Sequence, residues 1–172
     1  MYRNTRNLIC TVGTSLYGNL INERMEFSLS TEMIQQKYQS FGGNEQRDLI
    51  RLLQELDGAD RRLGAEINSI YFLRNGGYIP ERLDRLVLLV SDTPDGQKLG
   101  SLLKDYFEAG NNRSGFVSVD QVIIETTTGL KDDDIEEFKG LGLKNLVHHI
   151  GYYVRQFGRE QVVINATGGY KA

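Results

Sequence analysis

The stretch LVLLVSDTPD at residues 86–95 decides the fold class. Its five consecutive apolar residues, 86–90, are typical of a strand that is buried on both faces. Thr93 and Pro94 then open a helix as N-cap and first helical residue. The helix shows one apolar face, at positions 99, 102, 103, 106 and 107. A buried strand that leads directly into an amphipathic helix is the unit of an α/β fold with parallel strands.

The same alternation of strand and helix runs through the rest of the chain. Short apolar or β-branched runs predict further strands at residues 8–12, 117–124 and 161–164. Helical spacing of apolar residues predicts helices at 49–56, 63–71 and 143–157. The stretch 19–41 is polar and irregular and gives no assignment. We therefore predict one domain, 1–172, of the α/β class: a Rossmann-like, mostly parallel sheet with helices on both faces.

Composition limits the function. The 172 residues are 40% hydrophobic and 25% charged, as in an ordinary globular domain, and the net charge is −3. That charge argues against broad binding of duplex DNA or RNA, although a small anion can still be held locally. The single cysteine, Cys10, is expected to be an inert core thiol, and neither a metal site nor a cofactor is expected. The first apolar run is too short for a signal peptide or a membrane span, which predicts a cytoplasmic protein.

Hydroxyl groups and glycines follow all four predicted strands. Ligands of open parallel sheets bind beyond the carboxyl ends of the strands, and glycines and hydroxyls there suit phosphate oxygens. Any one of these turns is equally typical of an ordinary strand-to-helix connection. The first and fourth turns together favour a binding site, provided that they meet in space. The four turns are Gly13-Thr14-Ser15-Leu16, Ser91-Asp92-Thr93-Pro94-Asp95-Gly96, Thr126-Thr127-Thr128-Gly129 and Asn165-Ala166-Thr167-Gly168-Gly169-Tyr170-Lys171.

Several familiar sites are absent from the sequence. It holds neither a P-loop nor a Gly-x-Gly-x-x-Gly after the first strand. A Rossmann-like site for a mononucleotide or dinucleotide stays open as an alternative, with Asp92 near the ribose, although helix capping also accounts for that residue. Ser15 has no histidine near it in sequence, which disfavours a hydrolase triad. His148 and His149 point about 100° apart on one predicted helix, so packing or surface roles are expected.

Two motifs near the ends of the sequence, TVGTSL at 11–16 and NATGGYKA at 165–172, resemble those of the CARF domain, the CRISPR-associated Rossmann-fold module of type III CRISPR accessory proteins. The likeness spans essentially the whole chain. It implies a homodimeric sensor that binds a cyclic oligoadenylate second messenger, with cyclic tetra-adenylate as the expected ring. Further pieces similar to one branch of that family lie at 64–69, 89–96, 138–141 and 145–147.

The resemblance also implies the site residues and an alternative activity. Ring nucleases of this family cut the ring without metal, by attack of a ribose 2′-hydroxyl on the adjacent phosphate. Ser15 would then position the ribose or phosphate, and Lys171 would stabilise the developing charge. Because the sequence stops where a last helix is expected to begin, the resemblance implies a domain truncated before that helix and any effector domain. The implied ligand contacts are Gly13, Thr14, Ser15, Leu16, Ser91, Asp92, Thr93, Asn165, Thr167, Gly168, Gly169, Tyr170 and Lys171.

Overall fold

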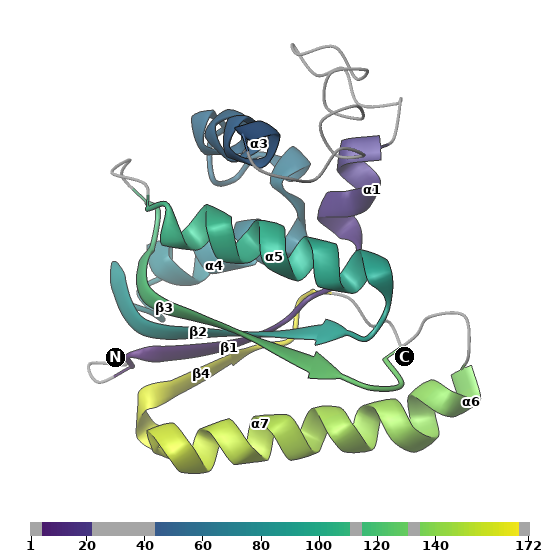
Figure 1. Cartoon of the computed structure of the whole chain (residues 1–172). Helices are drawn as coiled ribbons and strands as arrows, with labels where there is room; N and C mark the ends of the chain where they lie inside the picture. The colour runs from purple at the N-terminus through teal and green to yellow at the C-terminus, as the bar shows by residue number, and fades with distance from the viewer. Residues whose placement is uncertain (1–4, 22–43, 111–114, 131–134, 169–172) are drawn as a thin grey trace.

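The computed structural model describes residues 5–21, 44–110, 115–130 and 135–168, and its core is one sheet (Figure 1). The strands lie in the order β3-β2-β1-β4, and each neighbouring pair is parallel. The α/β prediction is therefore confirmed, and the described sheet is parallel throughout. The strands are β1 (Asn7–Thr11), β2 (Arg82–Ser91), β3 (Ser118–Thr127) and β4 (Val162–Asn165).

Helices cover both faces of this sheet, as predicted (Figure 1). On one side of the sheet lie α1 (Ser15–Ile21), α4 (Gly64–Asn75) and α5 (Pro94–Glu108), with α3 (Asn44–Glu55) farther from the strands and packed against α5. The opposite face carries α6 (Ile135–Glu137) and α7 (Leu143–Phe157). Three short segments complete the described elements: the 3-10 turns η1 (Arg61–Leu63) and η3 (Arg159–Gln161), and the π-helical η2 (Phe138–Gly142).

The two central strands are buried on both sides, which accounts for their unbroken apolar sequences. In β1 and β2, Leu8 and Leu88 pack into the core beneath α4 and α5, with no exposed surface. Ile9 and Val87 point the other way and pack against Tyr153 of α7. Side chains alternate between the faces of a strand, so a strand covered on both sides requires apolar residues at consecutive positions.

The start of α5 forms as the sequence predicts. The Thr93 hydroxyl accepts a hydrogen bond from the Gly96 amide at 3.1 Å, and Pro94 occupies the first turn. A Cβ atom at Gly96 would lie 2.1 Å from the Ser91 hydroxyl oxygen, so the tight connection from β2 requires glycine there. After the helix, Gly110 adopts a positive φ of 68°, a conformation that glycine tolerates and that commonly ends a helix.

The topology singles out one place at the carboxyl edge of the sheet. From β1 the chain crosses to β2 and then to β3 on the same side, whereas β4 pairs with the other side of β1. The direction of winding therefore reverses between β1 and β4, where open α/β sheets form their binding crevice. In register, Cys10 of β1 pairs with Asn165 of β4, so the two following turns begin side by side.

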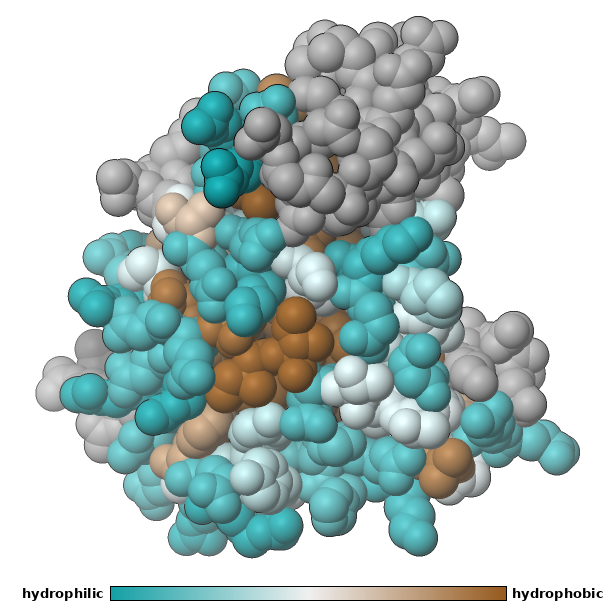
Figure 2. All heavy atoms as spheres, viewed as in Figure 1, coloured by the Kyte–Doolittle hydropathy of each residue, from teal (hydrophilic) through white to brown (hydrophobic). Residues whose placement is uncertain are grey.

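β3 is an outer strand of the sheet, on the side away from β4, and among the described strands it pairs only with β2. Figure 2 shows an apolar area at the middle of the view, between the levels of α5 and α7.

The stretch 19–41, which the sequence left unassigned, is described only in part. Residues 19–21 belong to α1, and residues 22–41 lie outside the described part of the chain.

Candidate functional site

The turn that follows β4 packs against the end of β1. Thr11, the last residue of β1, donates a hydrogen bond from its hydroxyl to the Gly168 carbonyl oxygen at 2.6 Å. A Cβ atom built at Gly168 would lie only 2.3 Å from the Thr11 carbonyl oxygen. The fourth turn therefore meets the chain directly before the first turn, as the hypothesis of a shared site requires, and glycine at position 168 permits this close approach.

The side chain that connects these turns comes from α4. Glu66 is fully buried, and its Oε1 accepts a hydrogen bond from the Gly13 amide at 2.8 Å. Its Oε2 accepts one from the Ser15 hydroxyl at 3.0 Å. On the other side, a Cβ at Gly168 would come within 2.8 Å of Glu66 Oε1. One buried carboxylate thus organises the first turn and contacts the fourth.

Our sequence analysis did not identify Glu66 as a site residue. A signal was present, because Glu66 lies three residues after Leu63 and four before Ile70, within the apolar face of its helix. An acidic residue is rarely buried unless it has hydrogen-bond partners. Its position on that face indicates a buried polar contact, and the contacts are the two donors of the first turn.

Ser15 lies where α1 begins and where α4 begins. Its hydroxyl oxygen accepts a hydrogen bond from the Ala65 amide at 2.8 Å while its hydrogen is directed at Glu66. The residue as a whole is exposed. The Ser15 hydroxyl therefore provides an acceptor for the Ala65 amide, which has no partner within the first turn of α4, while Ser15 remains exposed to solvent.

Asn165 shapes the fourth turn from inside. Its amide nitrogen donates to the Ser69 hydroxyl at 2.7 Å and approaches the Cys10 sulfur at 3.5 Å. Its carbonyl oxygen accepts hydrogen bonds from the Thr167 amide, at 3.2 Å, and from the Thr167 hydroxyl. Only 4% of Asn165 is exposed. The side chain thus fixes the turn and ties it to α4 through Ser69.

The predicted contact residues of the first and fourth turns fall into three groups. Thr14, Ser15 and Thr167 are exposed. Leu16 is fully buried in the core and presents no surface to a ligand. Three further predicted contacts are also buried: Gly13, Asn165 and Gly168. The last three lie outside the described residues: Gly169, Tyr170 and Lys171.

The turn after β2 has internal bonds of its own. The Ser91 and Thr93 hydroxyls are 2.7 Å apart and hydrogen-bonded. Gln97 of α5 donates to the Ser91 carbonyl oxygen at 2.8 Å and to the Thr126 hydroxyl at 3.1 Å, which links the second and third turns. Asp92 Oδ1 is buried and receives no hydrogen bond from the described residues. A role for this turn at the rim of the site stays a prediction.

Cys10 is the buried thiol that the sequence predicts. Burial, and then the nearby Glu66 carboxylate, raise the pKa of the Cys10 thiol well above its ordinary value. A thiol in this state stays protonated and is a poor nucleophile.

The adjacent histidines have separate surroundings. His149 Nδ1 lies 3.5 Å from a carboxylate oxygen of Glu125, and Tyr153 donates to the other oxygen at 2.7 Å. His148 is exposed. Among the residues that the structure describes, no three His, Cys, Asp or Glu side chains are grouped as metal ligands. The three consecutive aspartates at 132–134 lie outside that part of the chain.

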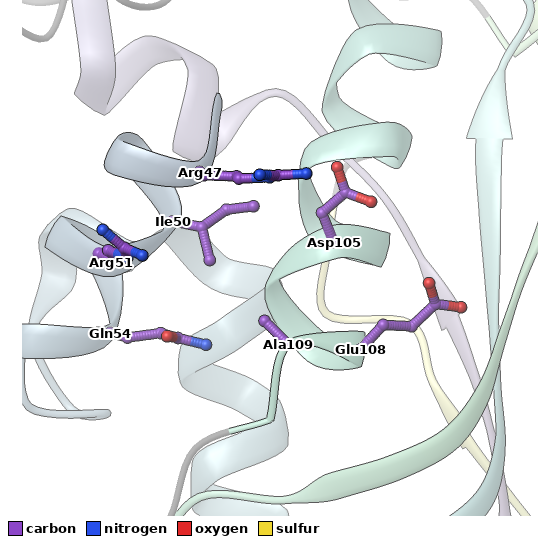
Figure 3. A pocket seen from close by; sticks show the side chains of 7 residues that line it. All are labelled: Arg47, Ile50, Arg51, Gln54, Asp105, Glu108 and Ala109. Carbon is purple, nitrogen blue, oxygen red and sulfur yellow. The ribbon is translucent and has the colours of Figure 1, made fainter. Parts of the chain in front are cut away.

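A groove of about 600 Å³ lies elsewhere, between α3 and α5 (Figure 3). Charges of both signs border it, and the Arg47 side chain extends toward Asp105. Gln54 holds the two helices together through bonds to the carbonyl oxygens of Tyr106 and Gly110, at 3.3 and 2.9 Å. None of the strand-end turns contributes to its wall. The lining residues are Arg47, Ile50, Arg51, Gln54, Asp105, Glu108 and Ala109.

Comparison with protein families places the chain in one of them. The model of a family described as CRISPR-associated protein (Cas_APE2256) matches residues 61–172. This range includes α4 with Glu66 and the fourth turn, whereas the first turn precedes it. No curated protein matches the chain. In the part of the chain that the structure describes, every helix is too short or too polar to cross a membrane.

Proposed function

Because the chain belongs to the CRISPR-associated Cas_APE2256 family, we propose that it is a CARF-type sensor domain that binds a cyclic oligoadenylate in type III CRISPR defence. The observation that carries this proposal is the contact of the fourth turn with the end of β1, directly before the first turn, at the switch point of the sheet. Three exposed residues with hydroxyl groups, Thr14, Ser15 and Thr167, are presented there on buried supports.

The chemistry of this edge suits an RNA-like ring. Phosphate oxygens need amide and hydroxyl donors, and ribose 2′-hydroxyls need polar partners. With a net charge of −3, the protein cannot attract a polyanion through its overall field. The positive charge must act locally, and Lys171, three residues after Gly168, is the residue that we expect to supply it.

The expected homodimer follows from the symmetry of the ligand. A cyclic tetra-adenylate repeats the same nucleotide around its ring, and a two-fold dimer offers the same patch twice. One ring bound across two copies of the exposed turns would therefore meet equivalent groups on each side. This arrangement predicts one ring per two chains in a titration.

The direct test is a binding titration with cyclic tetra-adenylate, accompanied by thermal shifts with cyclic hexa-adenylate, ATP and NAD. We expect stabilisation by a cyclic oligoadenylate. Lys171→Ala should weaken binding by about 1.5–3 kcal/mol, the range for a charge-assisted contact. Gln54→Ala, in the α3–α5 groove, is the control and should bind as wild type. Stabilisation by NAD or ATP alone would instead favour an ordinary nucleotide-binding domain.

Cleavage of the ring is the second candidate activity, and the exposed position of Ser15 at the shared edge favours it. Labelled cyclic tetra-adenylate is incubated with excess protein in EDTA, and the products are separated. A product with a 2′,3′-cyclic phosphate would identify a metal-independent ring nuclease, with Ser15→Ala lowering cleavage more than binding. An intact ring that remains bound would identify a sensor that does not cut.

A further inference from the structure

The hydroxyl of Ser15 has almost no freedom in its hydrogen bonding. A serine hydroxyl has one hydrogen to donate and two lone pairs that accept. The Ala65 amide uses one lone pair, at 2.8 Å. The hydrogen is directed at Glu66 Oε2, 3.0 Å away, because a carboxylate accepts hydrogen bonds and donates none. One lone pair remains for a ligand, and Ser15 is exposed.

With Glu66 as a carboxylate, neither neighbour can reverse its role. A backbone amide only donates, so Ala65 always occupies a lone pair. Glu66 is fully buried, with Oε1 bound to the Gly13 amide at 2.8 Å and the fourth turn packed beside it at Gly168. The carboxylate therefore cannot turn away to release the hydroxyl hydrogen. The direction of the Ser15 hydroxyl is set from inside the protein before any ligand arrives.

From this arrangement we propose that Glu66 is a positioning residue that presents Ser15 to the ligand only as a hydrogen-bond acceptor, so that this position selects a ribose 2′-hydroxyl. The inference rests on the proposed binding of a cyclic oligoadenylate. A 2′-hydroxyl can donate to the free lone pair of Ser15. A phosphate oxygen has only lone pairs and is repelled by it. Ser15 thus contacts the sugar of the ligand and does not bind its phosphates.

The variant Glu66→Gln reverses this polarity with almost no change in shape. The Gly13 amide requires an acceptor, so the glutamine oxygen takes the place of Oε1 and the glutamine NH2 group faces Ser15. Ser15 then accepts hydrogen bonds from both Ala65 and the glutamine. Its own hydrogen is released toward the ligand, and the acceptor becomes a donor.

The probes are cyclic tetra-adenylate and the same ring with 2′-fluorine in place of each 2′-hydroxyl, since fluorine cannot donate a hydrogen bond. Because one ring would meet Ser15 from each of two chains, wild-type protein should bind the hydroxyl ring roughly 30-fold more tightly, as expected for loss of about two hydrogen bonds. Glu66→Gln should lower the ratio of the two affinities, because Ser15 then donates, and a 2′-fluorine that cannot donate is still a weak acceptor. Ser15→Ala, which removes the acceptor without burying a new group, should do the same. Gln54→Ala should keep the wild-type ratio.

The outcomes separate the inference from the function on which it rests. If the hydroxyl ring binds and the ratio is the same in wild type, Glu66→Gln and Ser15→Ala, the selection by Ser15 is refuted and ring binding stands. If Glu66→Gln does not fold, Ser15→Ala alone decides by the same criterion. If neither ring binds wild-type protein, the proposed function fails, and this inference fails with it.

Discussion

Gly168→Ala tests whether the turns after β1 and β4 are pressed together. A Cβ at this position would lie 2.3 Å from the Thr11 carbonyl oxygen and 2.8 Å from Glu66 Oε1. The first of these atoms belongs to the backbone of a central strand and cannot rotate away. The added methyl group must therefore push the fourth turn off the first.

The contact distances give the expected size of the effect. Ordinary contact begins at 3.4 Å, so the turns must separate by about 1 Å. Overpacking of this kind costs about 1–3 kcal/mol. The movement also stretches the 2.6 Å bond from the Thr11 hydroxyl to the Gly168 carbonyl oxygen, which costs about 1 kcal/mol more. We expect the free energy of unfolding to fall by about 2–4 kcal/mol.

Urea denaturation monitored by circular dichroism measures this change from the shift of the midpoint at constant slope. The matched control is Gly18→Ala in α1, where the added Cβ meets no atom within 4 Å. Replacing a helical glycine by alanine should raise the unfolding free energy by about 0.5–1 kcal/mol. A Gly168→Ala protein within about 0.5 kcal/mol of wild type would show that the turns are not in contact and would remove the basis of the shared site.

Three further perturbations probe the supports of the fold and site. Thr93→Ala removes the N-cap of α5 and should lower the unfolding free energy by about 1 kcal/mol in the same urea assay, whereas Thr93→Ser should restore most of it. Ser69→Ala leaves the buried Asn165 amide without its 2.7 Å partner, so thermal melting should show a loss of about 1–3 kcal/mol; an unchanged melting temperature would mean that this bond does not hold the fourth turn. Burial and the hydrogen bond to Glu125 raise the pKa of Tyr153 above its unfolded value of about 10. The neutral tyrosine therefore adds to the free energy of unfolding below about pH 10, and this contribution decreases as the pH rises above about 10. Stability measured from pH 8 to 11 should therefore decline less in Tyr153→Phe than in wild type, and parallel curves would contradict this assignment.

The order of elements could be predicted from the sequence because the central strands are buried on both faces. An unbroken apolar run as short as residues 86–90, closed by a helix start, is typical of such a strand and of few other structures. The ends of the strands were harder to predict. β2 begins at Arg82 and β3 extends to Thr127, beyond the predicted apolar runs. These polar terminal residues remain in the parallel ladder, because Arg82 pairs with Ser118 and Thr127 pairs with Ser91. Such residues carry no hydrophobic signal, and only the neighbouring strand reveals their conformation.

The same distinction applies to the site. The first and fourth turns were predictable, since glycines and hydroxyls after strands in an open sheet have a general meaning. Glu66 was not, because its role depends on contacts with Gly13 and Ser15, more than fifty residues away along the chain. Asn165 shows a related difficulty, since its sequence position suggests a ligand contact whereas its amide bonds to Ser69 and Thr167 inside the protein. Sequence patterns identified the turns but not the groups that hold them.

Glu66 and Ser69 stand three residues apart on one side of α4, less than a single helical turn, and each holds a different loop. If α4 tilts or slides, the turns after β1 and β4 are therefore expected to move with it at the same time and in the same direction. While these hydrogen bonds persist, the turn after β1 and the turn after β4 cannot separate from α4 independently. The two turns are therefore expected to move together with α4 as one rigid unit.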